Sequence, residues 1–260
     1  MNFRELHERE QLFVMPNPWD VGSAKLLASL GFEALATTSA GFAWSIGKVD
    51  TTVTRDELVA HVRALAAATP LPLSVDSERC FPDDPGGVAE TVRLLADAGA
   101  AGFSIEDYDP GGDRIEDVEV AAERVRVAAQ ARGELVLAAR AENHLYGLDD
   151  LDDTIARLQA YRDAGADVVY APGLVDLEQI AAVVEAVGVP VNVLARPDGP
   201  SIAELASVGV RRVSTGGALA RAAYGTLLEA AQELREHGTS RYAEHGAPRD
   251  ALQVAFTDGG

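Results

Sequence analysis

The sequence is poor in lysine, with only Lys25 and Lys48 among its 260 residues. Acidic residues outnumber lysine and arginine by 41 to 22, which gives a net charge of −19. Such a charge repels nucleic acids and anionic membrane surfaces, so neither is expected to be a partner. An anionic substrate would need a local positive centre, either a metal ion or an arginine.

Cysteine and long apolar runs are also scarce. Cys80 is the only cysteine, so no internal disulfide can form, as is usual in a reducing cytoplasm. We expect this residue to be an inert small hydrophobe. No run of 18 apolar residues suggests a membrane span, and the charged stretch 1–10 lacks the apolar centre of a signal peptide. The sequence therefore predicts a cytoplasmic protein that does not bind membranes.

Short apolar segments alternate with longer amphipathic ones along the chain. Strands are expected at 12–15, 34–38, 73–76, 102–105, 135–139, 167–171, 189–194 and 211–215. Helices are expected at 24–30, 55–67, 87–98, 118–131, 151–164, 177–187, 202–207 and about 218–237. Residues 39–50 and 108–114 are interpreted as loops, and 238–260 as a polar tail.

This alternation indicates parallel pairing of the strands. Eight such units in a single domain, 1–260, predict a (β/α)8 or TIM barrel. A doubly wound open sheet is the alternative, but the chain has neither a G-x-G-x-x-G motif after its first strand nor a P-loop.

Two neighbouring strands end in groups of carboxylates. Asp76 and Glu78 follow one strand, and Glu106 and Asp107 follow the next. In TIM barrels these strand ends form the mouth where catalytic residues lie. Crowded carboxylates repel each other unless a cation or bound protons neutralise them, and oxygen ligands suit a hard ion such as Mg²⁺. We interpret the set as a metal site; helix N-caps and solvated loop residues are the alternative.

Six motifs in order along nearly the whole chain resemble the isocitrate lyase/phosphoenolpyruvate mutase superfamily, in its mutase-like bacterial branch. The motifs are Pro16–Asp20, Thr37–Gly41, Asp76–Glu78, Glu106–Asp107, Ala139–Glu142 and Ala164–Asp167. The resemblance implies enzymes that make or break C–C or P–C bonds of small 2-oxo or 2-hydroxy carboxylates with Mg²⁺, for which Mn²⁺ could substitute. It also implies a homotetramer (a dimer of dimers) or a dimer, with the last helix exchanged between subunits.

The resemblance assigns the metal site to three acids. Asp76 is similar to the direct metal ligand of the family. Glu78 and Glu106 are similar to the acids that hold the metal's water molecules.

A second group of residues is expected to bind the substrate. Ser39, Ala40 and Gly41 resemble the segment whose backbone N–H groups and hydroxyl bind the substrate carboxylate. Arg140 resembles the cation that pairs with the substrate's far end, and Asp76 reaches the substrate through the metal. Asn192 is placed at the same mouth by its position at a strand end.

The catalytic residues are expected to be Arg140, Asp50, Glu106 and Tyr108. Asp50 resembles the acid that closes the loop after the second strand. Lyases of the family carry a Lys-Lys-Cys-Gly-His loop where this chain has 108–114, with no lysine, cysteine or histidine.

The group that moves the proton therefore stays open among Asp107, Tyr108, His144 and a metal-bound water. A solvated loop position is the alternative for His144, and His61 is expected at the surface.

Three functions remain open. The first is a Mg²⁺-dependent lyase or decarboxylase that acts on a small 2-oxo dicarboxylate through an enolate. The second is a P–C bond enzyme, either a mutase or a phosphonopyruvate hydrolase. The third is an inactive homologue that binds carboxylates. The three acids and Arg140 favour an enzyme, because an inactive site has little need of a metal.

Overall fold

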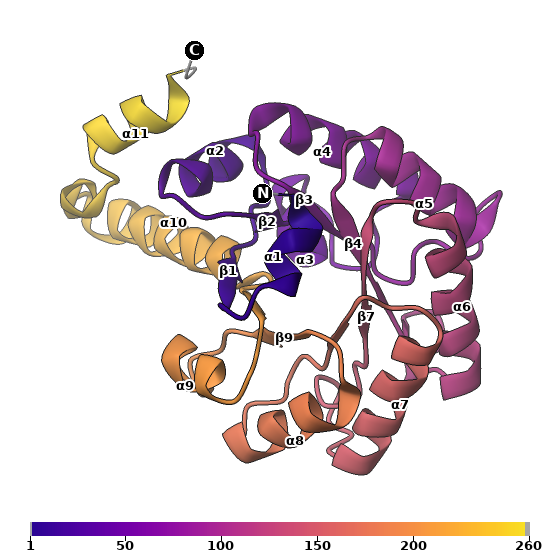
Figure 1. Cartoon of the computed structure of the whole chain (residues 1–260). Helices are drawn as coiled ribbons and strands as arrows, with labels where there is room; N and C mark the ends of the chain where they lie inside the picture. Colours follow the sequence, from indigo (N-terminus) through magenta and orange to yellow (C-terminus); the bar gives the residue numbers. More distant parts are fainter. Residues whose placement is uncertain (1, 258–260) are drawn as a thin grey trace.

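Eight parallel strands form the centre of the computed structural model, which describes residues 2–257 (Figure 1). The strands are β1 (Phe13–Met15), β2 (Leu35–Ala36), β3 (Leu73–Asp76), β4 (Gly102–Glu106), β7 (Val136–Arg140), β8 (Val168–Tyr170), β9 (Val191–Leu194) and β10 (Arg212–Ser214). Their order in the sheet is β1-β10-β9-β8-β7-β4-β3-β2. The first strand thus pairs with the last, and a backbone hydrogen bond from Ala36 N–H to the Pro16 carbonyl (3.1 Å) joins the two remaining edges. The predicted eight-stranded barrel is confirmed.

Helices surround the barrel on all sides in Figure 1. They are α2 (Val21–Ser29), α4 (Arg55–Ala68), α5 (Gly87–Asp97), α6 (Val118–Ala131), α7 (Leu151–Asp163), α8 (Leu177–Val187), α9 (Ile202–Ser207) and α10 (Ala218–His237). Local sequence fixes several of their starts. The Thr54 hydroxyl accepts from Glu57 N–H, and the Glu57 carboxylate accepts from Thr54 N–H, which satisfies two free donors at the start of α4. None of the helices in residues 2–257 is long and apolar enough to cross a membrane.

The sequence did not predict several short elements. They are α1 (Phe3–Glu8), α3 (Ser39–Ser45), the antiparallel pair β5 (Tyr108–Asp109) and β6 (Arg114–Ile115), η1 (Arg241–His245) and α11 (Arg249–Phe256). The expected loops therefore contain a helix and a hairpin, and the expected polar tail contains α11, which packs against α2. These elements are too short for a hydrophobic period to show.

Helix α3 begins where a loop was expected. The Thr38 hydroxyl accepts from Gly41 N–H and caps it. The Phe42 ring of α3 stacks on the His61 ring of α4, with centroids 3.8 Å apart. The expectation that His61 lies at the surface is therefore wrong: the residue is 7% exposed, and burial lowers its pKa to about 4.

Helix α1 covers the N-terminal end of the barrel. Phe3 and Leu6 pack with Phe13 and Met15 in a small cluster inside the strands. The His7 ring meets the Phe13 ring edge-on at 5.0 Å. Figure 1 shows α1 lying across this end of the strands. Because this end is filled with side chains, a ligand can enter only from the opposite end.

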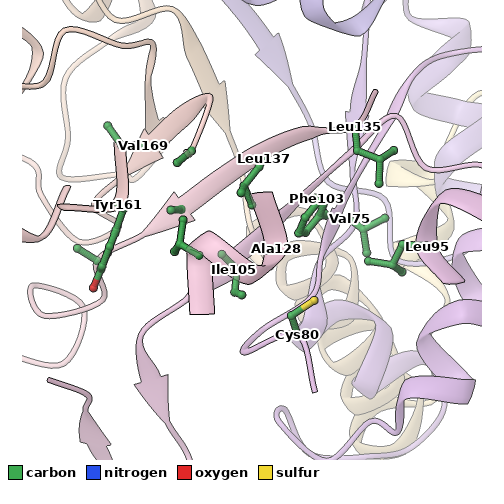
Figure 2. Close-up of a cluster of buried hydrophobic side chains, with 14 of the residues drawn as sticks. Val75, Cys80, Leu95, Phe103, Ile105, Ala128, Leu135, Leu137, Tyr161 and Val169 are labelled. Carbon is green, nitrogen blue, oxygen red and sulfur yellow. The ribbon is translucent and has the colours of Figure 1, made fainter. Parts of the chain in front are cut away.

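The larger core lies between the strands and the surrounding helices (Figure 2). It contains outward-facing strand residues and the helix residues that cover them, including Val75, Phe103, Ile105, Leu137, Val169, Leu95, Ala128 and Tyr161. Cys80 is fully buried in it, and burial raises the pKa of its thiol to about 12. The thiol is thus protonated and packed as a small hydrophobe.

Helix α10 extends away from the barrel (Figure 1). Ala220 is its only buried residue, whereas Leu227 and Leu228 are each 62% exposed and Leu234 is 51% exposed. Exchange of this helix between subunits stays a prediction.

Candidate active site

A cavity of about 180 Å³ opens at the C-terminal ends of the strands. It brings together six of the predicted site residues, namely Ser39, Ala40, Asp50, Asp76, Arg140 and Asn192. The volume is that of roughly six molecules of liquid water. The site therefore suits a molecule with few non-hydrogen atoms.

Arg140, at the end of β7, lies at the centre of the acidic groups. Its Nη1 is 2.8 Å from Asp76 Oδ1 and 3.2 Å from Glu106 Oε2, and its Nε donates to Glu142 Oε1 at 2.7 Å. The three carboxylates raise the pKa of Arg140 well above its ordinary value. One guanidinium is thus shared by three carboxyl groups.

Asp76 is held in place from the neighbouring strand end. Its Oδ2 accepts a hydrogen bond from Ser39 N–H (3.0 Å), and its backbone N–H donates to Thr37 Oγ1 (2.8 Å). Asp50 lies nearby, and burial together with the charge of Asp76 raises its pKa, while a hydrogen bond with Ser39 opposes the rise. Asp50 also lines the cavity, and its raised pKa gives it a greater tendency than an ordinary aspartate to carry a proton.

Gly41 is required by close packing behind the cavity. A Cβ atom at this position would lie 2.6 Å from Thr38 Cγ2 and 3.0 Å from Trp19 Cβ. The glycine lets α3 approach the strand end. The N–H groups of Ser39 and Gly41 donate to Asp76 and Thr38, so a carboxylate bound here would compete with these protein acceptors.

Glu78 and Glu106 show that the acidic rim of the site lacks positive charge. Burial, with the charges of Asp76 and Asp50, raises the pKa of Glu78 to about 8. Burial also raises the pKa of Glu106 well above its ordinary value, although Arg140 opposes this. A hard divalent cation would favour the ionised form of both carboxyl groups, because it would supply the missing positive charge.

The carboxylates suit such a cation, although they do not surround one position closely enough to bind it by protein atoms alone. No group of three His, Cys, Asp or Glu side chains in residues 2–257 converges on one metal position. Mg²⁺ commonly keeps several waters and takes one or two carboxylates. Asp76 as a direct ligand, with waters held by Glu78 and Glu106, agrees with that preference.

Stability without metal is predicted to fall as the pH rises. The folded pKa of Glu78, about 8, lies above its ordinary value of 4.5. Below pH 4.5 both states are protonated, and between 4.5 and 8 the unfolded state has lost a proton that the folded state keeps. Each pKa unit corresponds to about 1.4 kcal/mol, so we expect the Tm in EDTA to fall by about 5 °C or more from pH 5 to 9.

Thermal melts across this range test the prediction. Glu78→Gln should flatten the profile, and an equal slope in this variant would contradict the assignment.

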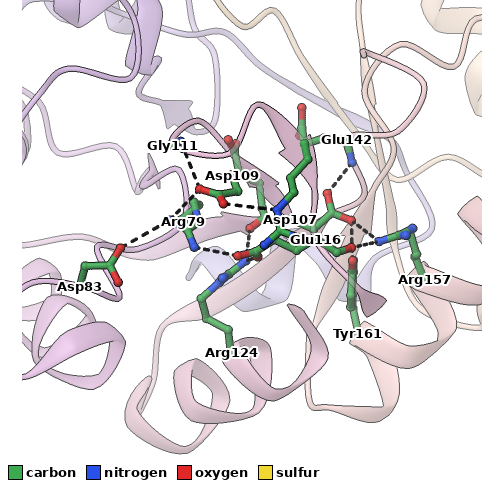
Figure 3. A network of polar contacts seen from close by, with 12 residues as sticks. Arg79, Asp83, Asp107, Asp109, Gly111, Glu116, Arg124, Glu142, Arg157 and Tyr161 are labelled. Atoms are coloured by element: carbon green, nitrogen blue, oxygen red, sulfur yellow. Dashed lines mark hydrogen bonds and ion pairs between the residues drawn. The ribbon is translucent and has the colours of Figure 1, made fainter. Parts of the chain in front are cut away.

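Asp107 faces away from the cavity into a buried polar network (Figure 3). It is 0% exposed, accepts hydrogen bonds from Tyr161 Oη (2.6 Å) and Glu142 N–H (2.8 Å), and lies 3.2 Å from Arg157 Nη1. These contacts join β4, β7 and α7. The structure therefore places this candidate proton carrier out of reach of a ligand.

The segment after β4 lies beside the cavity. Tyr108 donates its hydroxyl to Asp113 Oδ1 (2.8 Å) and stacks on Tyr146 with ring centroids 3.7 Å apart, and it is not among the residues that line the cavity. Arg79 forms ion pairs with Glu116 and Asp109, as Figure 3 shows, so its charge is used within the protein.

His144 differs from expectation, and Asn17 links strand ends. The side chain of His144 is 6% exposed, with Nδ1 3.4 Å from Asp149 Oδ1, so a solvated loop position is wrong. Asn17 joins strand ends across the seam of the barrel, because its Nδ2 donates to the Thr37 carbonyl (2.6 Å) and its Oδ1 accepts from Thr215 N–H (2.8 Å).

Several cavity residues were missed by sequence reasoning. They are Ser74, Ser104, Tyr170 and Arg212. One signal was present: Arg212 is a charged residue inside an expected strand, where a side chain on the inner face must enter the barrel.

The TIM barrel, with carboxylates gathered around one arginine at its mouth, has the form of an enzyme active site. Residues 3–235 match the phosphoenolpyruvate phosphomutase family, and the chain belongs to this family. The resemblance to the isocitrate lyase/phosphoenolpyruvate mutase superfamily is thereby confirmed.

Relatives and solved structures extend this result. An uncharacterized protein of Mycobacterium tuberculosis, Rv1998c, is 35% identical over 99% of this chain and 97% of its own length. An oxaloacetate decarboxylase of Paraburkholderia xenovorans is 30% identical over 81% of this chain and 72% of its own. A crystal structure from Burkholderia cenocepacia, provisionally named a lyase/mutase, superposes with a TM-score of 0.92 at 52% identity and covers 98% of this chain and 94% of its own. An oxaloacetate acetylhydrolase bound to oxalate superposes with a TM-score of 0.86 at 27% identity, with coverages of 98% and 92%.

Proposed function

We propose that the protein is a Mg²⁺-dependent lyase or decarboxylase that cleaves a C–C bond of a small 2-oxo dicarboxylate, with oxaloacetate as the first candidate. The observation that carries this proposal is the small cavity lined by Asp76 and Arg140, with Glu106 in contact with Arg140. Similarity to an oxaloacetate decarboxylase and to an oxaloacetate acetylhydrolase supports the choice of substrate.

Different residues of the site are assigned to the metal ion and to the substrate. Asp76 would hold the metal ion, while Glu78 and Glu106 hold its waters. When bound, Mg²⁺ supplies the charge that stabilises the enolate left by bond cleavage. The N–H groups of Ser39, Ala40 and Gly41 would orient the 2-oxo acid end by donating hydrogen bonds to its carboxylate, for which Ser39 and Gly41 exchange their present acceptors, Asp76 and Thr38.

Asp50 is the residue we propose for proton transfer. It lines the cavity and has a raised pKa, whereas Asp107 is sealed in the core and Tyr108 lies outside the cavity lining. A carboxyl group with a raised pKa is a stronger base when ionised than an ordinary aspartate, which favours proton transfer.

P–C bond chemistry is the second candidate, because the matched family is that of a phosphomutase and a Burkholderia cenocepacia structure provisionally named a phosphonomutase is 35% identical with a TM-score of 0.83. A carboxylate and a phosphonate are both anions that offer oxygen atoms as hydrogen-bond acceptors, and the phosphonate has one oxygen more. An inactive carboxylate-binding protein is the third.

One experiment separates the three. Oxaloacetate and phosphonopyruvate are incubated with the protein in Mg²⁺ and in EDTA, and products are followed by NMR. Because Mg²⁺ alone decarboxylates oxaloacetate, the rate is compared with metal-only samples. Mg²⁺-dependent pyruvate or oxalate production above that background would support the proposal. Turnover of phosphonopyruvate alone would indicate P–C chemistry, and binding without turnover would indicate an inactive homologue.

We also propose that the chain assembles as a homotetramer or dimer through α10. Leu227 and Leu228 are exposed on a helix that the barrel hardly covers. Contiguous exposed apolar side chains of this kind mark interaction surfaces.

The double substitution Leu227→Glu with Leu228→Glu is expected to yield monomers in sedimentation velocity experiments, because it places charges in an apolar contact. Leu30→Glu, at a site that is 72% exposed on another face, is the control and should leave the assembly unchanged. An unaltered sedimentation coefficient in the double variant would argue against α10 as the interface.

A further inference from the structure

Arg212 is a second arginine of the cavity, and its charge is not matched by an acid. It extends from β10 into the barrel, lines the cavity and is 3% exposed. Its Nε donates to Asn192 Oδ1 (2.9 Å), and its Nη1 lies 3.4 Å from His7 Nε2. Within residues 2–257, no carboxylate forms an ion pair with it and no acceptor is bound to its Nη2.

The contrast with Arg140 decides which arginine can attract a substrate anion. Arg140 already contacts three carboxylates. Burial and the nearby charge of Arg140 lower the pKa of Arg212 to about 10, which leaves it charged at neutral pH. A buried charge without a counterion is costly, and an anion bound beside it would offset that cost. Arg212 is therefore the arginine of the cavity whose positive charge is available to a bound anion.

Hydroxyl and amide side chains line the cavity together with this guanidinium. Ser74 and Ser104 come two residues before Asp76 and Glu106 on the same strands, so they face the same way but lie roughly 7 Å deeper. Neither hydroxyl has a hydrogen-bond partner among the described residues. The cavity thus changes from acidic at the rim to cationic and hydroxyl-rich at the floor.

Small side chains leave this floor open. TIM barrel interiors are usually filled by bulky branched residues. Here Ala36, Ser74 and Ser104 occupy inner positions and line the cavity. The space they leave belongs to the same cavity that Arg212 and Asn192 line.

We propose that Arg212, with Asn192, Ser74 and Ser104, forms an oxyanion site at the barrel floor that binds the second anionic group of the substrate. The group is a carboxylate or a phosphonate, while the 2-oxo acid end stays at the acidic rim. The orientation rests on the function proposed above. The site makes the enzyme selective for dianionic over monoanionic 2-oxo acids.

The test compares wild type with Arg212→Gln by calorimetric titration in Mg²⁺. Three ligands are used: pyruvate, which has no second anion; the non-cleavable 3,3-difluorooxaloacetate, which has a second carboxylate; and phosphonopyruvate, which has a phosphonate. We expect Arg212→Gln to weaken both dianions about ten-fold or more and pyruvate by less than about two-fold. The larger loss identifies which oxyanion the floor prefers. Equal affinities in the two proteins, or an equal loss for all three ligands, would overturn the proposal.

Control variants separate this role from a structural one. Arg211→Gln alters the adjacent arginine, whose guanidinium donates to the Glu10 carbonyl outside the barrel, and should bind all three ligands as wild type does. Arg212→Lys keeps the charge and should retain part of the preference for dianions. If Arg212→Gln does not fold, Ser104→Ala removes a floor hydroxyl and should weaken the dianions alone; unchanged selectivity in that variant would contradict the proposal.

A metal-free arm distinguishes this proposal from the proposed function. Inorganic phosphate and malonate are added in EDTA, and the Tm is measured. Stabilisation of wild type but not of Arg212→Gln would uphold the oxyanion site even if no 2-oxo acid were turned over. Stabilisation of neither protein, together with unchanged ligand selectivity, would refute the site while leaving Mg²⁺-dependent turnover to be judged separately.

Discussion

Asp76→Asn is expected to lower Mg²⁺-dependent turnover of oxaloacetate by a factor of about 10³ or more. The amide keeps the size of the side chain but removes the negative charge that would bind the metal. It also changes the partner of Ser39 N–H and of Arg140 Nη1, which lie 3.0 and 2.8 Å from its oxygens. Initial rates across a range of Mg²⁺ concentrations give the measurement, after subtraction of the metal-only rate.

Asp83→Asn provides a matched control after the same strand. Asp83 has an 88% exposed side chain and only a 3.5 Å ion pair with Arg79, so its loss should leave the rate within about two-fold. If Asp76→Asn kept wild-type turnover at saturating Mg²⁺, Asp76 could not be the metal ligand.

Arg140→Gln is expected to lower the free energy of unfolding by about 3–5 kcal/mol in EDTA. The substitution leaves Asp76, Glu106 and Glu142 without the cation that they share. For a chain of this size the loss corresponds to a fall in Tm of roughly 10 °C. Mg²⁺ should restore part of the lost stability in this variant, because it supplies charge to the same carboxylates. Thermal and urea unfolding with and without Mg²⁺ test both statements.

Arg93→Gln is the control for this experiment. Arg93 also contacts two carboxylates, those of Glu90 and Asp97, but its side chain is 57% exposed on α5. Solvent screens such pairs, so the expected change is below about 1 kcal/mol and independent of Mg²⁺. Similar losses in the two variants would mean that the charges around Arg140 are as well solvated as those at the surface.

The barrel could be predicted from the sequence because its signals are periodic and repeated. Each strand is a short apolar run before polar residues, and several helices end at a glycine, such as Gly99 and Gly165, whose φ angles are positive. These signals are local, and eight of them support one another. Helix α3 lacked such support, because seven residues including a glycine show no clear period.

The site was only partly predictable, because the register of a strand decides which of its side chains point into the barrel. Glu106 and Asp107 are adjacent and chemically alike, yet one contacts Arg140 in the cavity and the other lies in the core against Tyr161. Arg211 and Arg212 divide in the same way between outside and inside. Successive side chains of a strand point to opposite faces, so the direction of one residue in each pair fixes that of the other. The partners themselves, such as His7 for Arg212, come from segments about 200 positions apart and cannot be seen in a linear pattern.

The pairing of β1 with β10 has a consequence for synthesis of the protein. Asn17 also binds Thr215, so the seam of the barrel joins residues separated by 198 positions. A chain emerging from the ribosome holds β1 without its paired strand β10 until about 200 further residues have been made. Contacts so distant in sequence are slow to form. The ligand cavity, which takes residues from both β1 and β10, therefore comes into existence only after β10 has been made, and a chain truncated before β10 should have no binding site.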